Sequence, residues 1–332
     1  MTLSNKNDIL YPRIKYKYRY NPKEQFHRMK HYFIVNPAAG QTDSFKELTE
    51  KLKSISADFE IYRTAAKGDG VRFIKEQCEE YSYEKLRFYA CGGDGTINEV
   101  VNGVYGYENA EVSCFPCGSG NDFVKYYGGK ERFLDAEELI SAAAEPIDLI
   151  KAADRYAVNV VNFGFDTYAC KIMNEVKFKP FIGGKRAYYS GVLKALLYAM
   201  KTKAMVYADG ELLNENGEIL LCSAANGKYY GGSFCCAPRS ENNDGLMEVC
   251  LIKPIPRIKF ISLVGAYEKG KHLESPAFRD IMVYRRCKKL EIKTEKNFSI
   301  TLDGELIEGQ DFTCEIIPSA IKFAVPTKTE KK

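Results

Sequence analysis

Four short apolar runs between residues 31 and 147 each end in a turn rich in glycine or proline and lead into a segment of helical character. They are HYFIVNPAAG, FEIYRTAAKGDG, KLRFYACGGDGTINEV and AEVSCFPCGSGNDF. After the first run, apolar residues recur every three or four positions at Phe45, Leu48, Leu52 and Ile55. Strands that alternate with helices form a parallel sheet with helices packed on it. The pattern predicts a doubly wound α/β domain over residues 31–147.

The pattern changes near residue 148. Segments such as RYAVNVVNFGFD, KAMVYADGELL, LMEVCLIK and DFTCEIIP alternate apolar and polar residues with a period of two, and Gly, Asn, Asp or Pro separate them. Many short strands joined by turns predict an antiparallel β-sandwich or barrel. We place this second domain, as a β-sandwich, at residues 148–309.

The composition argues against several kinds of site. The chain has 332 residues and eleven cysteines, an odd number scattered through apolar segments, which favours reduced thiols over a disulfide framework. Cys114 and Cys117 form a C-x-x-C, but this spacing in a strand points the two side chains to opposite faces. None of the three histidines lies in an HExxH or Ser-His-Asp context. The apolar stretches are shorter than the roughly 18 residues of a membrane span, so we expect a cytoplasmic protein.

The first 30 residues form a basic extension. They contain eight Lys and Arg against Asp8 and Glu24, whereas the whole chain has a net charge of only +4. Aromatic and basic residues alternate in YPRIKYKYRYNPKEQFHRMK. This segment is a solvated tail, an added edge strand, or an arm that attracts anionic phospholipid headgroups or nucleic acid. Of these partners we expect the membrane surface and no nucleic acid.

The stretch CGGDGTINEV, residues 91–100, has the features of a phosphate site. An apolar strand precedes it, and an apolar helical face follows. Thr96 and Glu99 have the spacing of a capping box, so we expect the helix to begin near Thr96. Gly92, Gly93 and Gly95 carry no Cβ atom, which lets an outside group approach the N–H donors at the positive end of the helix.

Asp94 adds a requirement for a cation. A carboxylate repels phosphate unless a cation lies between them, and Mg²⁺ typically takes one or two carboxylates together with phosphate oxygens. The stretch therefore predicts a Mg-nucleotide site; a tight turn capped by Asp is the alternative, which leaves three glycines unexplained. The loops at Asn36–Gly40, Thr64 and Cys117–Asp122 also follow strands of this domain. The carboxyl ends of strands in an open α/β sheet converge on one ligand crevice.

Two Asp-Gly pairs occur in the second half of the chain. Asp303-Gly304 is followed by Glu305, and Asp244-Gly245 lies among oxygen-bearing side chains. Asp-Gly between apolar runs is a common signal of a short hairpin, and composition alone leaves both pairs as turns. The chain has no GxxxxGK[ST], VAIK, HRD or DFG motif, which excludes the Walker-type loop and the protein-kinase arrangement.

In their order, the motifs IVNPAAG, CGGDGTINEV, CGSGNDF, NGKYYGG, NNDGLMEV and LDGE resemble the lipid kinases of the diacylglycerol kinase and sphingosine kinase family, especially its bacterial members. The likeness covers residues 31–326. GGDGT alone is shared with NAD kinases, but LDGE together with the NDG segment is specific. The resemblance implies a lipid kinase that uses ATP and Mg²⁺, with its active site in the cleft between two domains. It also implies that residues 310–326 return to the first domain, ahead of a tail at 327–332.

The resemblance implies the nucleotide-binding residues of this chain. ATP would contact Asn36, Pro37, Ala38, Ala39, Gly40, Thr64, Gly93, Asp94, Gly95, Thr96, Ile97, Asn98, Glu99 and Ser119. Ser119 stands where relatives commonly have threonine, a substitution that keeps the hydroxyl group.

Metal-binding and catalytic residues follow from the same resemblance. Asp244 and the main-chain carbonyls of Glu241 and Leu246 would bind a structural metal ion, to which Asp94 and Asp122 would be linked. Glu305 would be the general base, with Asp303 as the second member of the catalytic acidic pair. Asp148 is an additional acidic position near the hinge. Glu248 replaces an aspartate found in many relatives and lies beyond the implied ligands.

A basic and aromatic segment, VKFKPFIGGKRAYYSGVLKALLYAM, suits a membrane surface. It places Lys177, Lys179, Lys185 and Arg186 beside Phe178, Phe181, Tyr188 and Tyr189, ahead of an amphipathic helix. The alternative is an ordinary packed helix with a solvated basic loop. We expect this segment and the N-terminal arm to dock the protein peripherally on anionic bilayers.

Together these features predict a kinase that phosphorylates the hydroxyl of a diacylglycerol-like lipid. A soluble metabolite kinase of the NAD-kinase type would share GGDGT but gives no reason for LDGE. A nucleotide-dependent membrane regulator would lack the catalytic carboxylates, which are present here. The sequence leaves the acceptor open among diacylglycerol, phosphatidylglycerol, a sphingoid base and a prenol, and it leaves open a homodimer formed through sheet edges.

Overall fold

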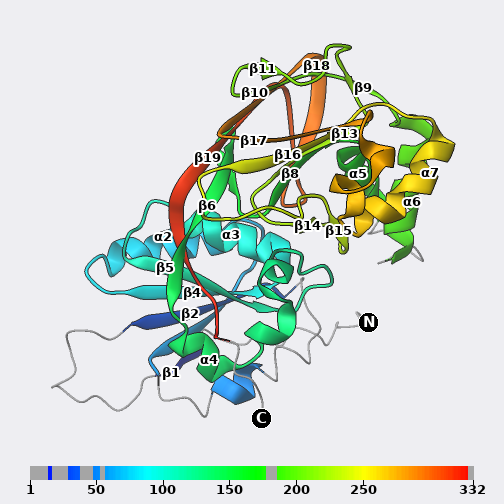
Figure 1. The fold of residues 1–332 in the computed structure, drawn as a ribbon. Coiled ribbons are helices and arrows are strands. Elements are labelled where there is room, and N and C mark those ends of the chain that lie inside the picture. The colour runs from blue at the N-terminus through cyan, green and yellow to red at the C-terminus, as the bar shows by residue number, and fades with distance from the viewer. Residues whose placement is uncertain (1–13, 17–28, 38–47, 53–56, 177–184, 328–332) are drawn as a thin grey trace, which may run out of the picture.

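A computed structural model describes residues 14–16, 29–37, 48–52, 57–176 and 185–327 of the chain. Two domains are joined end to end in Figure 1. The α/β domain lies at the bottom of this view and the β-rich domain at the top. This arrangement confirms the predicted fold class.

The first domain is built on a parallel sheet in the order β3-β2-β4-β5. Its strands are β2 (Lys30–Val35), β3 (Phe59–Arg63), β4 (Leu86–Gly92) and β5 (Ala110–Pro116). The short strand β1 (Ile14–Tyr16), from the predicted basic extension, pairs antiparallel with β3 at the edge. For these three residues the structure therefore shows an added edge strand.

Helices cover both faces of this sheet, as expected of a doubly wound domain. On one face, Tyr32 of β2 meets Phe73 of helix α2 (Asp69–Glu80), edge to face, with ring centroids 5.7 Å apart. Helix α3 (Asp94–Val104) packs beside α2. On the other face, Arg87 of β4 donates to the carbonyl of Leu139 in α4 (Ala136–Ser141) at 3.1 Å. Because both faces are covered, every residue of β4 is buried.

Short 3-10 helices follow β5 in this domain, namely η2 (Phe123–Tyr127) and η3 (Lys130–Phe133). They place aromatic rings against Phe323, in the C-terminal part of the described chain. Phe123 and Tyr127 both contact Phe323, with centroid distances of 5.1 and 5.6 Å.

The second domain is an antiparallel assembly of short and long strands. The main strands are β6 (Ala144–Ala152), β7 (Arg155–Ala157), β8 (Val160–Gly164), β10 (Met205–Ala208), β11 (Glu211–Leu212), β13 (Leu221–Ala225), β16 (Met247–Ile252), β17 (Met282–Cys287), β18 (Lys289–Leu302) and β19 (Glu305–Ala324). Two small ribbons pair β9 (Thr202–Lys203) with β12 (Glu218–Ile219) and β14 (Tyr229–Tyr230) with β15 (Phe234–Cys235).

Three helices pack together at one side of this domain: α5 (Phe165–Val176), α6 (Lys185–Tyr198) and α7 (Arg257–Glu268). The short helices η4 (Lys271–Leu273) and η5 (Pro276–Phe278) follow α7. Figure 1 shows α5, α6 and α7 grouped on the right, away from the first domain's sheet. The sequence did not predict α7, because its apolar residues are spread around the whole helix and only Tyr267 is buried.

Strand β16 departs from the predicted alternation of apolar and polar residues, because all six of its residues are buried. Met247, Val249 and Leu251 belong to the core that the sheet encloses. Cys250 and Ile252, which alternate with them, belong to a second core beneath the helices. Each face of the strand thus has its own apolar layer.

Strand β19 connects the two domains. It pairs antiparallel with β18 and β6, and near its end Lys322 and Phe323 pair in parallel with Glu111 and Val112 of β5. In Figure 1 it is the long red strand that runs from the upper domain into the lower one. Residues 310–324 are the far part of this strand, and the predicted boundary at residue 148 falls inside β6. The domains therefore share one continuous sheet.

Candidate active site

The turn between β4 and α3 carries the GGDGT motif. Helix α3 begins at Asp94, with Gly93 as its N-cap and no side-chain hydrogen bond at that cap. The predicted capping box is wrong, because Glu99 accepts a hydrogen bond from the amide of Gly68 at 3.0 Å. The helix also starts two residues before the expected Thr96. Its first amides are thus left without a side-chain cap of their own.

The glycines of this turn have different reasons to be there. A Cβ on Gly92 would lie 2.2 Å from Thr96 Oγ1, and a Cβ on Gly118 would lie 2.4 Å from the Cα of Gly93. Gly92 therefore leaves room for Thr96 of the same turn, and Gly118 allows the turns after β4 and β5 to pack on each other. A Cβ on Gly95 would meet nothing within 4 Å. Of the three glycines in the motif, Gly95 is the one that faces open space at the helix start.

Two carboxylates lie side by side next to this turn. Asp94 Oδ1 accepts from the amide of Phe123 at 3.1 Å. Asp122 accepts from Lys125 Nζ at 2.6 Å and from the amide of Gly232, in the second domain, at 2.9 Å. Burial, followed by the charge of Asp122, raises the pKa of Asp94 to about 6.

This carboxylate pair fits a nucleotide-bound Mg²⁺ ion. Within the described ranges, no group of three or more His, Cys, Asp or Glu side chains lies close enough to hold a metal ion. Mg²⁺ typically takes only one or two carboxylates and completes its shell with phosphate oxygens and water. Asp94 and Asp122 supply that number. Lys125 already offsets the charge of Asp122, so a Mg²⁺ ion would share this carboxylate with the ammonium group and offset the charge of Asp94.

Four other predicted nucleotide-binding residues, Asn36, Pro37, Thr64 and Ser119, lie at or just after the carboxyl ends of the parallel strands. Asn36 Nδ2 lies 3.4 Å from Thr96 Oγ1, and Thr64 Oγ1 donates to the carbonyl of Val35 at 3.3 Å. Pro37 and Ser119 are exposed in the loops after β2 and β5. Ala38, Ala39 and Gly40 lie outside the described residues.

Two of the predicted nucleotide-binding residues point away from the carboxyl ends of the strands. Ile97 is fully buried in the core of the first domain. Asn98 is also buried and reaches across to the second domain, where its Nδ2 donates to the carbonyl of Tyr156 at 2.8 Å. Within the motif, a ligand in front of α3 can therefore be reached only by the residues of its first turn.

Asp303 is held in the turn between β18 and β19. The φ angles of Asp303 and Gly304 are +47° and +87°, as in a type I′ hairpin turn, so the turn signal of Asp-Gly is correct. Its carboxylate accepts four hydrogen bonds of 2.8 to 3.0 Å, from Asn98 Nδ2 and the amides of Val158, Asn159 and Val160. Burial raises the pKa of Asp303. Because both oxygens are occupied, this side chain anchors the turn.

Glu305, two residues later, is accessible instead. Its side chain is 31% exposed and pairs with the ammonium of Lys67 in the first domain. Lys67 lies in the loop between β3 and α2, and the next residue, Gly68, is the one bonded to Glu99 of α3. Sequence reasoning missed Lys67, for which the only signal was its position shortly after Thr64.

At the predicted structural metal site, the side chain of Asp244 contacts other groups of the protein. Asp244 Oδ1 accepts from the amide of Leu246 at 3.0 Å, and its Oδ2 pairs with the guanidinium of Arg286. Glu241 is exposed. Asp148 is buried and accepts from the amides of Gly245 and Ser319, each at 2.7 Å. Asp148 therefore ties the 241–246 loop to β19.

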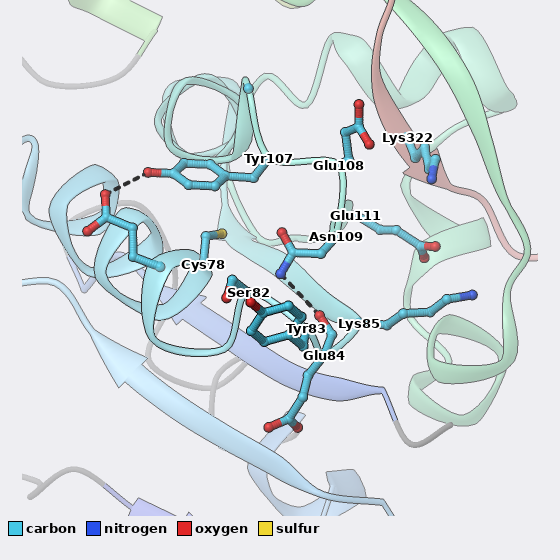
Figure 2. Close-up of a pocket in the computed structure, with 12 residues that line it drawn as sticks. Cys78, Ser82, Tyr83, Glu84, Lys85, Tyr107, Glu108, Asn109, Glu111 and Lys322 are labelled. Atoms are coloured by element: carbon cyan, nitrogen blue, oxygen red, sulfur yellow. Dashed lines mark hydrogen bonds between the residues drawn. The ribbon is translucent and has the colours of Figure 1, made fainter. Parts of the chain in front are cut away.

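A pocket of about 730 Å³ lies at the opposite side of the first domain's sheet, by the amino ends of β4 and β5. Figure 2 shows its lining residues, which come from the end of α2, the segments before β4 and β5, the start of β5, and Lys322 of β19. Tyr107 donates to Glu79 at 3.0 Å, and Asn109 Nδ2 donates to the carbonyl of Glu84 at 3.1 Å. Since ligands of such sheets bind at the carboxyl ends of the strands, this pocket is not the candidate site.

Comparison with known proteins agrees with this arrangement. Residues 30–152 match the model of the diacylglycerol kinase catalytic domain, and residues 159–325 match that of the YegS C-terminal NAD kinase beta sandwich-like domain. The chain belongs to the family of diacylglycerol kinase-like lipid kinases. It is therefore a kinase, and membership of this family implies the use of ATP.

Individual relatives match this kinase over most of its length. The diacylglycerol kinase of Bacillus subtilis is 29% identical over 281 residues, which are 82% of this chain and 88% of that protein. The "Probable lipid kinase YegS-like" protein of Chromohalobacter salexigens is 27% identical over 302 residues, covering 89% and 93% of the two chains. A crystal structure of a diacylglycerol kinase from Bacillus anthracis shares the fold, with a TM-score of 0.65, 22% identity, and coverage of 91% and 97%.

Proposed function

We propose that this kinase transfers the γ-phosphoryl group of ATP to the hydroxyl of diacylglycerol or a related lipid, giving phosphatidic acid or its analogue. The observation that carries the proposal is the position of Glu305. This accessible carboxylate follows a turn that Asp303 bonds to α3, the helix whose first turn faces the predicted phosphate site. The Bacillus subtilis relative named diacylglycerol kinase supports the choice of acceptor.

Glu305 acts as the general base in this proposal. Its carboxylate accepts the proton of the lipid hydroxyl while the hydroxyl oxygen forms a bond to the γ-phosphorus and the bond to ADP breaks. The uncapped first turn of α3 binds phosphate oxygens through its amides. Asp94 and Asp122 would hold Mg²⁺, which when bound neutralises the charge on the phosphates.

We also propose that the kinase binds an anionic membrane through α6 and α7. Five apolar side chains of these helices are more than half exposed, namely Leu193, Leu197, Tyr198, Ile258 and Ile261. Arg257 joins the helices by donating to the carbonyls of Leu196 and Leu197 at 2.6 and 2.8 Å. Lys194 and Lys259 are exposed beside them, and residues 190–203 and 253–263 contain no acidic residue. Apolar and basic groups together suit an anionic lipid surface.

Part of the predicted docking region cannot be compared with this patch. Residues 177–184 and most of the N-terminal arm lie outside the described residues, as do the side chains of residues 185–189. No helix in the described ranges is long and apolar enough to cross a membrane.

The catalytic proposal is tested by a labelled-ATP assay with diacylglycerol, phosphatidylglycerol, a sphingoid base, a prenol and NAD as acceptors. We expect label in a lipid, and a loss of about 100-fold or more in kcat for Glu305→Gln. Glu308→Gln is the matched control, because Glu308 is exposed on the same strand. Label in NAD alone would favour the metabolite-kinase alternative, and an unimpaired Glu305→Gln variant would remove Glu305 from the mechanism.

The membrane proposal is tested by co-sedimentation with vesicles that contain phosphatidylglycerol. We expect Leu197→Glu and Ile258→Glu to reduce binding, because each places a negative charge in the apolar patch. Tyr83→Glu is the control, since Tyr83 is fully exposed on the first domain. Equal binding by all three variants and the wild type would reject α6 and α7 as the docking surface.

A further inference from the structure

The family resemblance assigns the 241–246 loop to a structural metal ion. In the structure, the positively charged side chain of Arg286 contacts this loop. Arg286 of β17 pairs with Asp244 through Nη2 and with Glu248 through Nε, the latter at 3.0 Å. The second oxygen of Asp244 accepts from the amide of Leu246. Both oxygens of the expected ligand therefore have partners within the chain.

The position of Arg286 is fixed by the sheet. Glu248 of β16 and Arg286 of β17 stand directly opposite each other in the antiparallel register. Their side chains therefore lie on the same face of the sheet and at neighbouring positions. The contact is a cross-strand pair, which the pairing of six residues on each strand maintains.

Glu248 gives Arg286 a reason to stay. The Glu248 side chain is only 3% exposed, whereas that of Arg286 is 48% exposed. A buried carboxylate without a cationic partner is costly, and Arg286 is the cation that pairs with Glu248 directly, while Arg239 and the Tyr284 hydroxyl lie nearby. Glu248 is the residue that differs from the aspartate of many relatives, and the structure shows it to be the second partner of this arginine.

Further arginines lie around this pair. A cavity of about 300 Å³ next to Asp244 is lined by Arg239, Glu241, Glu248, Tyr284, Arg285 and Arg286. Its three guanidinium groups balance the carboxylates of Glu241, Glu248 and the adjacent Asp244. These carboxylates are therefore neutralised without a metal ion.

We propose that Arg286 takes the place of the structural metal ion in this kinase and holds the 241–246 loop by bridging Asp244 and Glu248. The proposed Mg²⁺ position at Asp94 and Asp122 is a separate one and is unaffected. The inference concerns loop stability and metal content, so its failure would be distinguishable from failure of the proposed lipid phosphorylation.

The first experiment counts bound Mn²⁺ by electron paramagnetic resonance on the nucleotide-free protein. We expect wild type and Asp244→Asn to bind the same number of ions, because Asp244 is not a ligand. One ion fewer in Asp244→Asn would overturn the proposal. A second readout is the Tm in EDTA and in MgCl₂ plus MnCl₂: any rise on adding metal should be lost in Asp94→Asn, because Asp94 belongs to the other metal position. A rise of several degrees that Asp94→Asn retains would also overturn it.

The second experiment removes the cation. Arg286→Gln should lower Tm by about 3 °C or more, since it removes the direct ion pair of a buried carboxylate. The Tm of Arg286→Lys, which keeps the charge but not the forked geometry, should lie between those of the wild type and Arg286→Gln. Arg285→Gln is the matched control, because Arg285 is the exposed neighbour whose nearest carboxylate, on Glu211, is 3.9 Å away. Equal Tm values for Arg286→Gln and Arg285→Gln would contradict the bridging role.

Discussion

The side-chain amide of Asn98, in helix α3, donates a hydrogen bond to the carboxylate of Asp303 at 2.9 Å. Asp303 lies two residues before Glu305, on the other side of the domain junction. This contact links the helix behind the predicted phosphate site to the turn that presents the predicted base. In the proposed mechanism, this buried hydrogen bond holds the base at a fixed position relative to the phosphate site.

Replacing Asp303 by asparagine should destabilise the protein and slow the reaction. Each carboxylate oxygen of Asp303 accepts two hydrogen bonds, and asparagine replaces one of these oxygens by an NH₂ group. Two buried N–H donors would then lose their acceptor. We expect the free energy of unfolding to fall by about 3 kcal/mol, and kcat to fall because Glu305 is displaced. Urea unfolding and steady-state kinetics measure the two effects. Asp154→Asn, in the exposed turn between β6 and β7, is the control; equal stability of both variants would contradict the anchoring role.

Asp303 also shows how far the sequence could be interpreted. The Asp-Gly pair predicted the hairpin, and the family resemblance predicted an acidic pair. Neither could reveal that the amides of residues 158–160 converge on the carboxylate, because those donors lie more than 140 residues away along the chain. For the same reason the capping-box spacing of Thr96 and Glu99 was misleading, since the amide of Gly68 takes the Glu99 carboxylate.

Patterns that depend on neighbouring residues were predicted well. The strands of both domains follow from apolar periodicity, because each strand buries one or both faces against a fixed layer. The bridging role of Arg286 could not be predicted, because it depends on the register between β16 and β17. Cross-strand register is a property of the folded sheet rather than of either segment alone.

Replacing Gly95 by alanine should separate ligand binding from packing. No atom lies within 4 Å of the added methyl group, and alanine is favoured over glycine in a helix, so stability should equal or exceed that of the wild type. If phosphate binds in front of α3, the methyl group occupies its space, and the Kd for ATP should rise about tenfold or more. Isothermal titration calorimetry measures this change.

Two further alanine variants serve as comparisons for Gly95→Ala. Gly265→Ala, at an equally open helical position in α7, should leave ATP affinity unchanged. Gly118→Ala should reduce stability instead, because its Cβ would collide with the backbone of Gly93. Wild-type ATP affinity in Gly95→Ala would argue against a phosphate site at this turn.

Replacing Lys67 by alanine should impair catalysis without unfolding the protein. Its side chain is 65% exposed, so the ion pair with Glu305 contributes less than about 1 kcal/mol to stability. The ammonium nevertheless adds positive charge where, in the proposed mechanism, the polyphosphate of ATP would meet the Glu305 carboxylate. We expect the KM for ATP to rise and kcat to fall, with partial recovery in Lys67→Arg. Lys75→Ala, at an exposed position of α2, is the control; kinetics of Lys67→Ala that match it would assign Lys67 no role in the site.

His272 should make stability depend on pH. It is 1% exposed, and burial lowers its pKa to about 4, compared with about 6.5 in an unfolded chain. Between these values the unfolded state binds a proton that the native state does not. The free energy of unfolding should therefore fall as the pH is lowered from about 6.5 to 4, by up to about 3 kcal/mol from this residue. Urea unfolding at pH 7.5 and 4.5 measures the loss.

The variant His272→Phe isolates this contribution, because phenylalanine has a similar volume and keeps the ring contacts with Tyr267 and Phe278, whose centroids lie 4.8 and 6.0 Å away. Buried carboxylates with raised pKa values, such as that of Asp166, act in the opposite direction, but equally in both proteins. The difference between the two pH values should thus be smaller in His272→Phe than in the wild type. An identical pH dependence in the two proteins would show that His272 is protonated as readily in the native state as in the unfolded chain.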